Sequence, residues 1–179
     1  DSLTLLKTGL FKDKSVIDVG CGGGFPSFPL AVCSENCAVT ANDATLKKLN
    51  FVQETAKAAG ISNLAVLPGR AEEIAHTQKR ESFDVAVARG VARLNVLCEL
   101  CLPLVKKGGH FVAMKGSKGA EELEEAKTAI KLLGGKFIDI MQIELPLFDR
   151  QHTLIIIKKV SPTSKEYPRQ YAKITKKPL

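Results

Sequence analysis

Short runs of β-branched and other apolar residues alternate along the chain with longer segments whose apolar positions recur every three or four residues. Runs of the first kind predict strands, and segments of the second kind predict helices. Because the two kinds alternate from residue 15 to residue 133, the chain predicts a mostly parallel sheet with helices on both faces. The strands expected in this part are Ser15–Val19, Ala38–Ala41, Leu64–Leu67, Phe83–Ala88 and His110–Met114.

Glycines mark the ends of two of the expected helices. Gly60 follows the first, and the pair Gly134-Gly135 follows the last, as is common after a helix C-terminus. The last helix is also rich in Glu early and in Lys late, which complements the helix dipole. The expected helices are Leu46–Ala59, Leu94–Leu102 and Ala120–Leu133.

Two further apolar runs, Phe137–Leu145 and Thr153–Lys159, follow one another with no helix between them, so they predict an antiparallel hairpin. Five parallel strands closed by such a hairpin are the layout of a Rossmann-like class I methyltransferase, an α/β fold. We assign residues 1–160 to this domain. Residues 161–179 are rich in Pro, Lys and Ser and predict an extended basic tail.

A glycine-rich turn follows the first expected strand, in the pattern D-x-G-x-G-x-G from Asp18 to Gly24. Such a turn between a strand and a helix is how α/β sheets hold an adenosine-bearing ligand. The spacing differs from the G-x-G-x-x-G of dinucleotide sites, because the sixth position counted from Gly20 is Phe25. The carboxylate of Asp18 suits a ligand with a cationic amino-acid end, which favours S-adenosylmethionine.

The carboxyl ends of parallel strands meet at one edge of the sheet, where open α/β sheets bind their ligands. Asp43 ends the second expected strand and is placed to accept ribose hydroxyls, although Asn42 beside it also favours a simple turn. Ala71 and Glu72 follow the third strand and are expected to hold the adenine, unless Glu72 only stabilises a helix N-terminus. The predicted cofactor-binding residues are Asp18, Gly20, Gly22, Gly24, Phe25, Asp43, Ala71, Glu72 and Arg89.

Three parts of the glycine turn each allow a second interpretation. Asp18 either contacts the ammonium group of the ligand or accepts hydrogen bonds from the amides of its own loop. Phe25 either forms a wall beside the adenosine or fills the core. Gly20, Gly22 and Gly24 let the backbone approach a ligand, but an ordinary tight turn also needs such residues.

Positive charge is concentrated near the C-terminus. The chain carries a net charge of +7, and residues 158–179 contain seven Lys or Arg against one Glu. This distribution predicts contact with a polyanion, with nucleic acid first, while a merely solvated tail is the alternative. A basic side chain that directly follows a buried strand is costly unless it is paired, so Arg89 should face the ligand crevice. The candidate substrate contacts are Arg89, Lys115, Arg150 and Arg169.

Cysteine usage and hydropathy exclude several other classes of protein. The five cysteines, which include Cys98-x-x-Cys101, lack the paired spacing of a zinc site and predict free thiols in a reducing compartment. We expect no bound metal. There is no run of about eighteen apolar residues that could cross a membrane. The chain is therefore expected in the cytoplasm.

The chain also contains several longer motifs, and their combination is more specific for one protein family than the glycine turn alone. They are Asp18–Pro29 (DVGCGGGFPSFP), Gly69–Glu73 (GRAEE), Ala88–Asn95 (ARGVARLN), Met114–Gly116 (MKG), Asp149-Arg150, Tyr167–Arg169 (YPR) and Lys176–Leu179 (KKPL). In order and spacing the chain resembles the bacterial ribosomal RNA small-subunit methyltransferase G family. That resemblance implies S-adenosylmethionine-dependent methylation of a guanine N7 in 16S ribosomal RNA, free or within the small ribosomal subunit. It also implies cofactor contacts at Gly20, Phe25, Ala71, Glu72 and Arg89.

The chemistry of guanine N7 fits the residue inventory. N7 carries an available lone pair, so its methylation needs no general base, and we predict that the protein only positions the reactants. Two alternatives stay open. One is a non-catalytic RNA-binding or assembly factor that keeps the fold, and the other is a small-molecule methyltransferase, which would not need a basic tail. We expect the protein to be a monomer.

Overall fold

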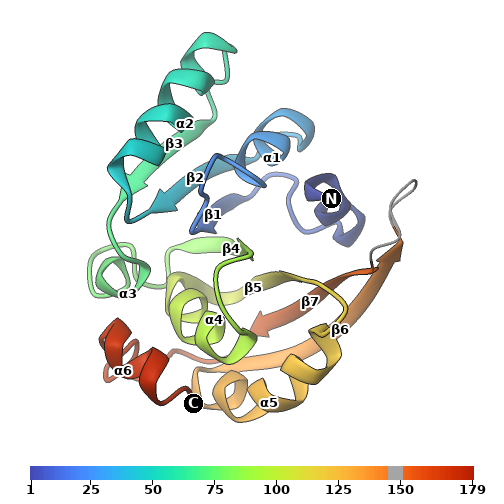
Figure 1. The fold of residues 1–179 in the computed structure, drawn as a ribbon, viewed down its shortest axis with the longest axis vertical. Helices are drawn as coiled ribbons and strands as arrows, with labels where there is room; N and C mark the ends of the chain where they lie inside the picture. The colour runs from blue at the N-terminus through green and yellow to red at the C-terminus, as the bar shows by residue number, and fades with distance from the viewer. Residues whose placement is uncertain (145–150) are drawn as a thin grey trace.

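A single sheet of seven strands organises the computed structural model, which describes residues 1–144 and 151–179 (Figure 1). The strands are β1 (Ser15–Val19), β2 (Ala38–Asp43), β3 (Leu64–Pro68), β4 (Phe83–Arg89), β5 (Val105–Lys115), β6 (Gly135–Glu144) and β7 (Gln151–Lys159). They lie in the order β3-β2-β1-β4-β5-β7-β6. The first five pair in parallel, and β7 pairs antiparallel with both β5 and β6. The predicted fold class is confirmed.

Helices cover both faces of the sheet, as expected from the alternating pattern. One face carries η1 (Ser2–Thr8), α1 (Ser27–Cys33) and α2 (Leu46–Ala58), and the other carries α3 (Ala71–Ile74), α4 (Leu94–Cys101), η2 (Leu102–Leu104), α5 (Gly119–Leu132) and α6 (Tyr171–Lys176) (Figure 1). The central strands are buried on both sides: in β1, Ile17 packs in the second of these layers and Val16 in the first. A strand buried on both faces has no exposed positions, which is why these strands are continuous apolar runs in the sequence.

Strand β5 begins five residues before its predicted start at His110. The predicted start fell just after Gly108-Gly109, but this pair lies within the strand, beside a register shift in the pairing of β4 with β5. At Gly109 a side chain would collide with the backbone carbonyl oxygen of Asp84 on β4. Glycine is needed here for close approach of two backbones inside the sheet rather than for chain reversal.

The C-terminal segment is packed against the rest of the chain, so the prediction of an extended tail is wrong. Residues 171–176 form α6, and the side chain of Ile174 is fully buried in the same cluster as α4 and α5. Lys159, just before the segment, is also fully buried, and its Nζ lies 3.0 Å from a carboxylate oxygen of Glu81. The division of the chain at residue 160 stays a prediction.

Arg80 holds the backbone of this C-terminal segment. Its guanidinium donates to the carbonyl oxygens of Tyr167 at 2.9 Å, Thr163 at 2.8 Å and Ser164 at 3.1 Å, and to that of Ala75 at 3.1 Å. The planar fork of an arginine can serve several acceptors at once. Because the three partners in this segment, Thr163, Ser164 and Tyr167, are more than 80 residues from Arg80 in the sequence, the composition of the segment alone did not reveal its packing.

We predict that Arg80→Lys lowers the free energy of unfolding by about 1–3 kcal/mol, because a single ammonium group cannot satisfy four carbonyl oxygens. Chemical denaturation measures the change. Arg93→Lys is the matched control, since Arg93 forms an exposed ion pair with Glu125, and it should change stability by less than about 0.5 kcal/mol. Equal effects of the two substitutions would contradict the anchoring role of Arg80.

Candidate active site

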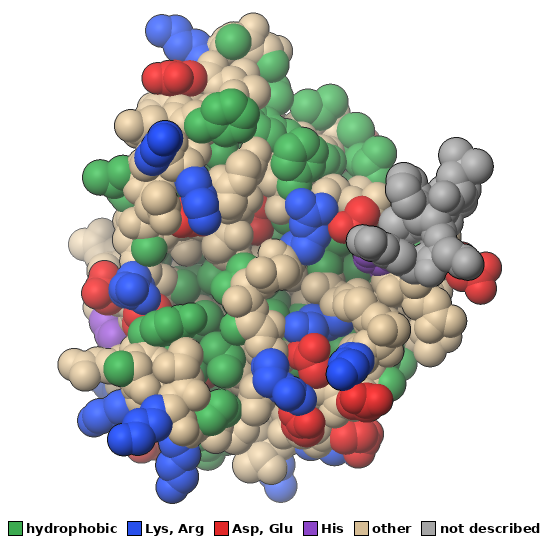
Figure 2. Space-filling model, viewed as in Figure 1, with side chains coloured by type: hydrophobic (Ala, Val, Ile, Leu, Met, Phe, Trp, Pro, Cys, Tyr) green, Lys and Arg blue, Asp and Glu red, His purple; other side chains and the backbone are tan. Residues whose placement is uncertain are grey.

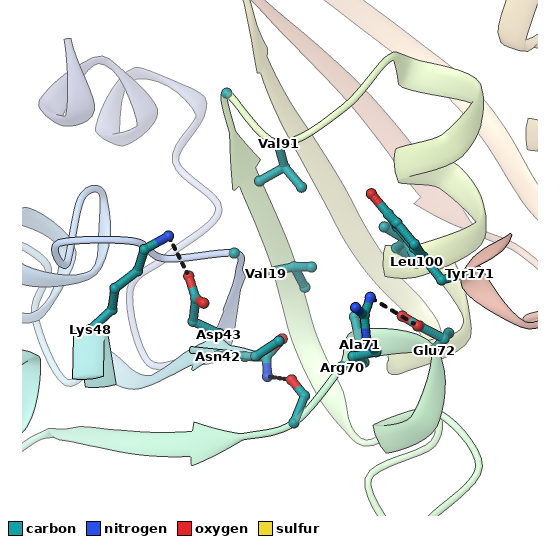
Figure 3. Close-up of a pocket in the computed structure, with 14 residues that line it drawn as sticks. Val19, Asn42, Asp43, Lys48, Arg70, Ala71, Glu72, Val91, Leu100 and Tyr171 are labelled. Carbon is teal, nitrogen blue, oxygen red and sulfur yellow. Dashed lines mark hydrogen bonds and ion pairs between the residues drawn. The ribbon is translucent and has the colours of Figure 1, made fainter. Parts of the chain in front are cut away.

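An open pocket of about 270 Å³ lies at the carboxyl ends of the parallel strands (Figure 3). The ends of β1 and β2 and the segments that follow β3 and β4 all contribute to it, as expected for a ligand site in an open α/β sheet. Four predicted residues line it: Gly20, Asp43, Ala71 and Glu72. The other lining residues are Val19, Asn42, Ala44, Lys48, Gly69, Arg70, Gly90, Val91, Leu100 and Tyr171.

The glycine turn is tied to the end of the neighbouring strand by backbone hydrogen bonds. The amides of Gly20 and Cys21 both donate to the carbonyl oxygen of Asn42, each at 2.9 Å. Gly20 has a φ of 73°, and a Cβ there would lie 2.6 Å from a methyl group of Val91, in the segment after β4. Glycine is therefore required both for the backbone conformation and for the close approach of the two segments.

Asp43 faces the pocket and also fixes the glycine turn. One carboxylate oxygen accepts from the amide of Gly22 at 3.1 Å and lies 3.7 Å from Nζ of Lys48, while the other accepts from the amide of Thr45 at 2.8 Å. The side-chain amide of Asn42 donates to the carbonyl oxygens of Leu67 and Gly69 at the end of β3, so it ties β2 to β3 and forms no local turn (Figure 3). Each carboxylate oxygen has two lone pairs, so Asp43 keeps acceptor capacity towards the pocket.

Asp18 is fully buried under the glycine turn and is not part of the pocket lining. Its Oδ2 accepts from the amide of Ser27 at 3.2 Å and from the Ser27 hydroxyl at 2.6 Å, so it binds its own loop, the second of the two roles considered for it. Within the described part of the chain, its Oδ1 has no hydrogen-bond partner. Burial is the main reason that the pKa of this carboxyl rises to about 6, against the opposing effect of the Ser27 bonds. A contact with the ligand ammonium stays a prediction.

Phe25 and Arg89 lie together beside the pocket. The side chain of Phe25 is 51% exposed, so it does not fill the core. The guanidinium carbon of Arg89 lies 5.8 Å from the centre of the Phe25 ring, and its Nη1 donates to the Asp1 carboxylate at 3.0 Å. Neither residue belongs to the pocket lining, and their predicted contacts with the cofactor stay predictions. The same holds for Gly22 and Gly24, which shape the turn at φ values of 56° and 91°.

Ala71 and Glu72 begin the short helix α3 at the pocket wall. Glu72 is buried, and burial raises its pKa, partly offset by hydrogen bonding and by the charge of Arg70. The Arg70 guanidinium lies 3.8 Å from the Glu72 carboxylate (Figure 3). The predicted pair is thus placed at the pocket, with an acceptor side chain and a backbone amide close together.

The predicted substrate contacts are less exposed than expected. Nζ of Lys115 donates to the carbonyl oxygen of Ala92 and pairs with Glu122, both at 2.8 Å. The guanidinium of Arg169 forms two hydrogen bonds to the buried carboxylate of Glu99. Both side chains therefore have structural partners, and a role in substrate binding would require these pairs to open. Arg150 lies outside the described residues.

Sequence reasoning missed several residues that line the pocket. Tyr171, the first residue of α6, lines the pocket. The guanidinium carbon of Arg70 lies 5.1 Å from the centre of the Tyr171 ring. Val91 and Leu100 contribute from the segment after β4 and from α4. No local signal marks Tyr171, because the segment that carries it reaches the pocket only through long-range contacts.

Among the residues that the structure describes, no group of three or more His, Cys, Asp or Glu side chains is arranged to hold a metal ion. Nor does any helix in that part of the chain combine the length and apolar character needed to span a bilayer.

The strand order, the glycine turn after β1 and the carboxylate ending β2 define the class I methyltransferase fold. Solved structures of other proteins have a similar fold. YcgJ from Bacillus subtilis has a TM-score of 0.67 at 15% identity, over 89% of this chain and 98% of that one. TYW2 from M. jannaschii, solved in complex with AdoMet, has a TM-score of 0.67 at 16% identity, over 89% of this chain and 76% of that one.

Sequence comparison narrows the class to one family. The family described as GidB, rRNA small subunit methyltransferase G, matches residues 1–155. The Staphylococcus saprophyticus ribosomal RNA small subunit methyltransferase G is 47% identical, over 98% of this chain and 74% of that protein. The Clostridium botulinum (strain Eklund 17B) protein of the same name is 41% identical, over 100% of this chain and 76% of that protein. The chain belongs to the rRNA small subunit methyltransferase G family, which confirms the resemblance seen in its motifs.

We predict that the buried Asp18 makes stability fall with rising pH. Its folded pKa of about 6 exceeds the ordinary value of 3.8, so the folded state holds the proton more tightly than the unfolded state. Stability relative to Asp18→Asn should therefore decrease by up to about 3 kcal/mol between pH 4 and pH 7, then level off. Denaturant unfolding of both proteins across this range measures the difference. Glu124→Gln, which removes an exposed carboxylate, is the control, and a pH-independent difference for Asp18→Asn would contradict the account.

Proposed function

We propose that the chain transfers a methyl group from S-adenosylmethionine to N7 of a guanine in 16S ribosomal RNA. The observation that carries this proposal is the pocket between the glycine turn, Asp43 and the Ala71-Glu72 pair, in a chain that belongs to the rRNA small subunit methyltransferase G family. We also propose that the substrate is ribosomal RNA, that the protein acts in the cytoplasm and that it acts as a monomer.

The residues of the pocket fit this cofactor. Asp43 supplies a carboxylate for the ribose hydroxyls, while Glu72 and the amide of Ala71 supply an acceptor and a donor for the adenine edge. Gly20 lines the pocket next to Val91, at the ends of β1 and β4, and the methionine portion would lie along this side of the pocket. When bound, S-adenosylmethionine supplies an electrophilic methyl group on a sulfonium sulfur.

The protein contributes position and exclusion of water rather than proton transfer. Guanine N7 has a free lone pair, so no residue has to remove a proton from it. No histidine belongs to the pocket lining within the described residues. Holding the reacting atoms in line lowers the barrier by about 7–11 kcal/mol in well-oriented intramolecular reactions, which is the scale available to such a site. We further propose that the exposed ring of Phe25 contacts the adenosine and that the adjacent Arg89 contacts the RNA, although neither side chain belongs to the pocket lining.

The basic residues that remain exposed favour RNA over a small-molecule substrate. Lys173, Lys176 and Lys177 are exposed on and just after α6, the helix that also carries Tyr171 to the pocket. Figure 2 shows Lys and Arg side chains gathered over this part of the molecule, at the lower left of the view. Phosphate contacts by such lysines contribute sequence-independent affinity close to the site of reaction.

We predict that Asp43→Asn abolishes most of the methyl transfer to 16S ribosomal RNA by weakening cofactor binding at least about tenfold, since a charge-assisted hydrogen bond is worth roughly 1.5–3 kcal/mol. The measurements are incorporation of a tritiated methyl group into the RNA and calorimetric titration with S-adenosylhomocysteine. Asp139→Asn, at an exposed position on β6, is the matched control and should retain both properties.

The outcomes separate the three functions under consideration. RNA binding and cofactor binding without methyl transfer by the unaltered chain would indicate a non-catalytic assembly factor. Cofactor binding without any RNA binding would favour a small-molecule methyltransferase. Full activity of Asp43→Asn would contradict the proposed place of the ribose.

A further inference from the structure

The pocket has one lining residue from the C-terminal end of the chain, Tyr171. Its ring lies beside Leu100 of α4 and across the pocket from Asn42 and Asp43 (Figure 3). The guanidinium carbon of Arg70 lies 5.1 Å from the centre of the ring, which is within the range of a cation–π contact. An aromatic ring and a guanidinium plane thus border the pocket together.

Anchors on both sides of Tyr171 fix its position. Two residues before it, the amide and the guanidinium of Arg169 donate three hydrogen bonds to the buried carboxylate of Glu99, at 2.6–2.9 Å. Three residues after it, Ile174 is fully buried. His76 adds a contact of 2.9 Å between its Nε2 and the carbonyl oxygen of Pro168. The ring therefore borders the pocket as part of the folded structure.

The neighbours of the ring identify the part of the ligand that it would meet. Arg70 directly precedes Ala71 and Glu72, which the proposed function places at the adenine, whereas Gly20 and Gly90 lie at the ends of β1 and β4. A flat aromatic face suits a purine, because base–aromatic stacking tolerates any base and needs no hydrogen bond. Tyr171 is thus at the nucleoside end of the pocket.

We propose that Tyr171 is a cofactor-binding residue that packs against the nucleoside of S-adenosylmethionine, with Arg70 supporting its ring. The inference rests on the proposed function. It assigns to the C-terminal segment a role in forming the cofactor site, beside the role in RNA binding that its lysines suggest.

The test is calorimetric titration of the full chain with two ligands, S-adenosylhomocysteine and 5′-methylthioadenosine, which has the nucleoside but lacks the amino-acid end. Tyr171→Leu keeps apolar bulk without the ring and should weaken both ligands by about tenfold, in line with the loss of one aromatic stacking contact. Tyr171→Phe keeps the ring and should stay within about twofold of the unaltered chain. Glu166→Gln, at an exposed position in the same C-terminal segment but outside the pocket lining, should leave both affinities unchanged.

Three results would overturn the inference while leaving the proposed function intact: unchanged affinities in Tyr171→Leu, a loss confined to S-adenosylhomocysteine, or a raised KM for RNA with unchanged cofactor affinity. The second would place the ring at the amino-acid end, and the third would assign it to the substrate. Failure of the unaltered chain to bind either ligand would overturn the proposed function and the inference together. Circular dichroism and thermal unfolding of each variant show that the comparison is made between folded proteins.

Discussion

The contact of the glycine turn with the neighbouring strand ends is the constraint on which the site depends. The carbonyl oxygen of Asn42 accepts from two successive amides of the turn, and Asp43 accepts from a third, so β1 and β2 end in one bonded unit. The same turn approaches the segment after β4 so closely that a side chain at Gly20 would meet Val91. Three strand ends are thus fixed relative to one another, and the pocket is the space left between them. Any residue other than glycine at position 20 would strain the backbone at this positive φ and displace the Val91 side chain.

Buried charged side chains are a second constraint on the structure. Asp18 lies under the glycine turn, and among the residues that the structure describes only one of its carboxylate oxygens has a hydrogen-bond partner; burial raises the pKa of this carboxyl despite the bonds from Ser27. Glu99 and Lys159 are buried too, but each has close partners, in Arg169 and Glu81 respectively. Removing one member of a buried pair leaves the other without compensation, so these pairs hold the C-terminal segment in place. The segment in turn carries Tyr171 to the pocket.

Much of this organisation could be predicted from the sequence, because it is encoded locally. The strand Ser15–Val19 was predicted with the observed bounds, since a short apolar run directly precedes a glycine turn. Asp43 and Glu72 could be placed at the pocket because parallel strands end at one edge of a sheet. The packing of the C-terminal segment could not be predicted, because its anchors, Arg80 and Glu99, lie about 70–90 residues earlier in the sequence. No local sequence pattern indicates these contacts. For the same reason Arg169 looked like a free cation in the sequence and is an ion-pair partner in the structure.

The chemical identity of the methylated atom tests the central claim most directly. The measurement is incubation of the chain with S-adenosylmethionine and 16S ribosomal RNA, followed by borohydride reduction and aniline cleavage, which cut RNA selectively at N7-methylguanine, and by mass spectrometry of the nucleosides. We predict 7-methylguanosine at a discrete position and cofactor-dependent cleavage there. Methylation at another atom, or cofactor binding with no transfer to RNA, would contradict it.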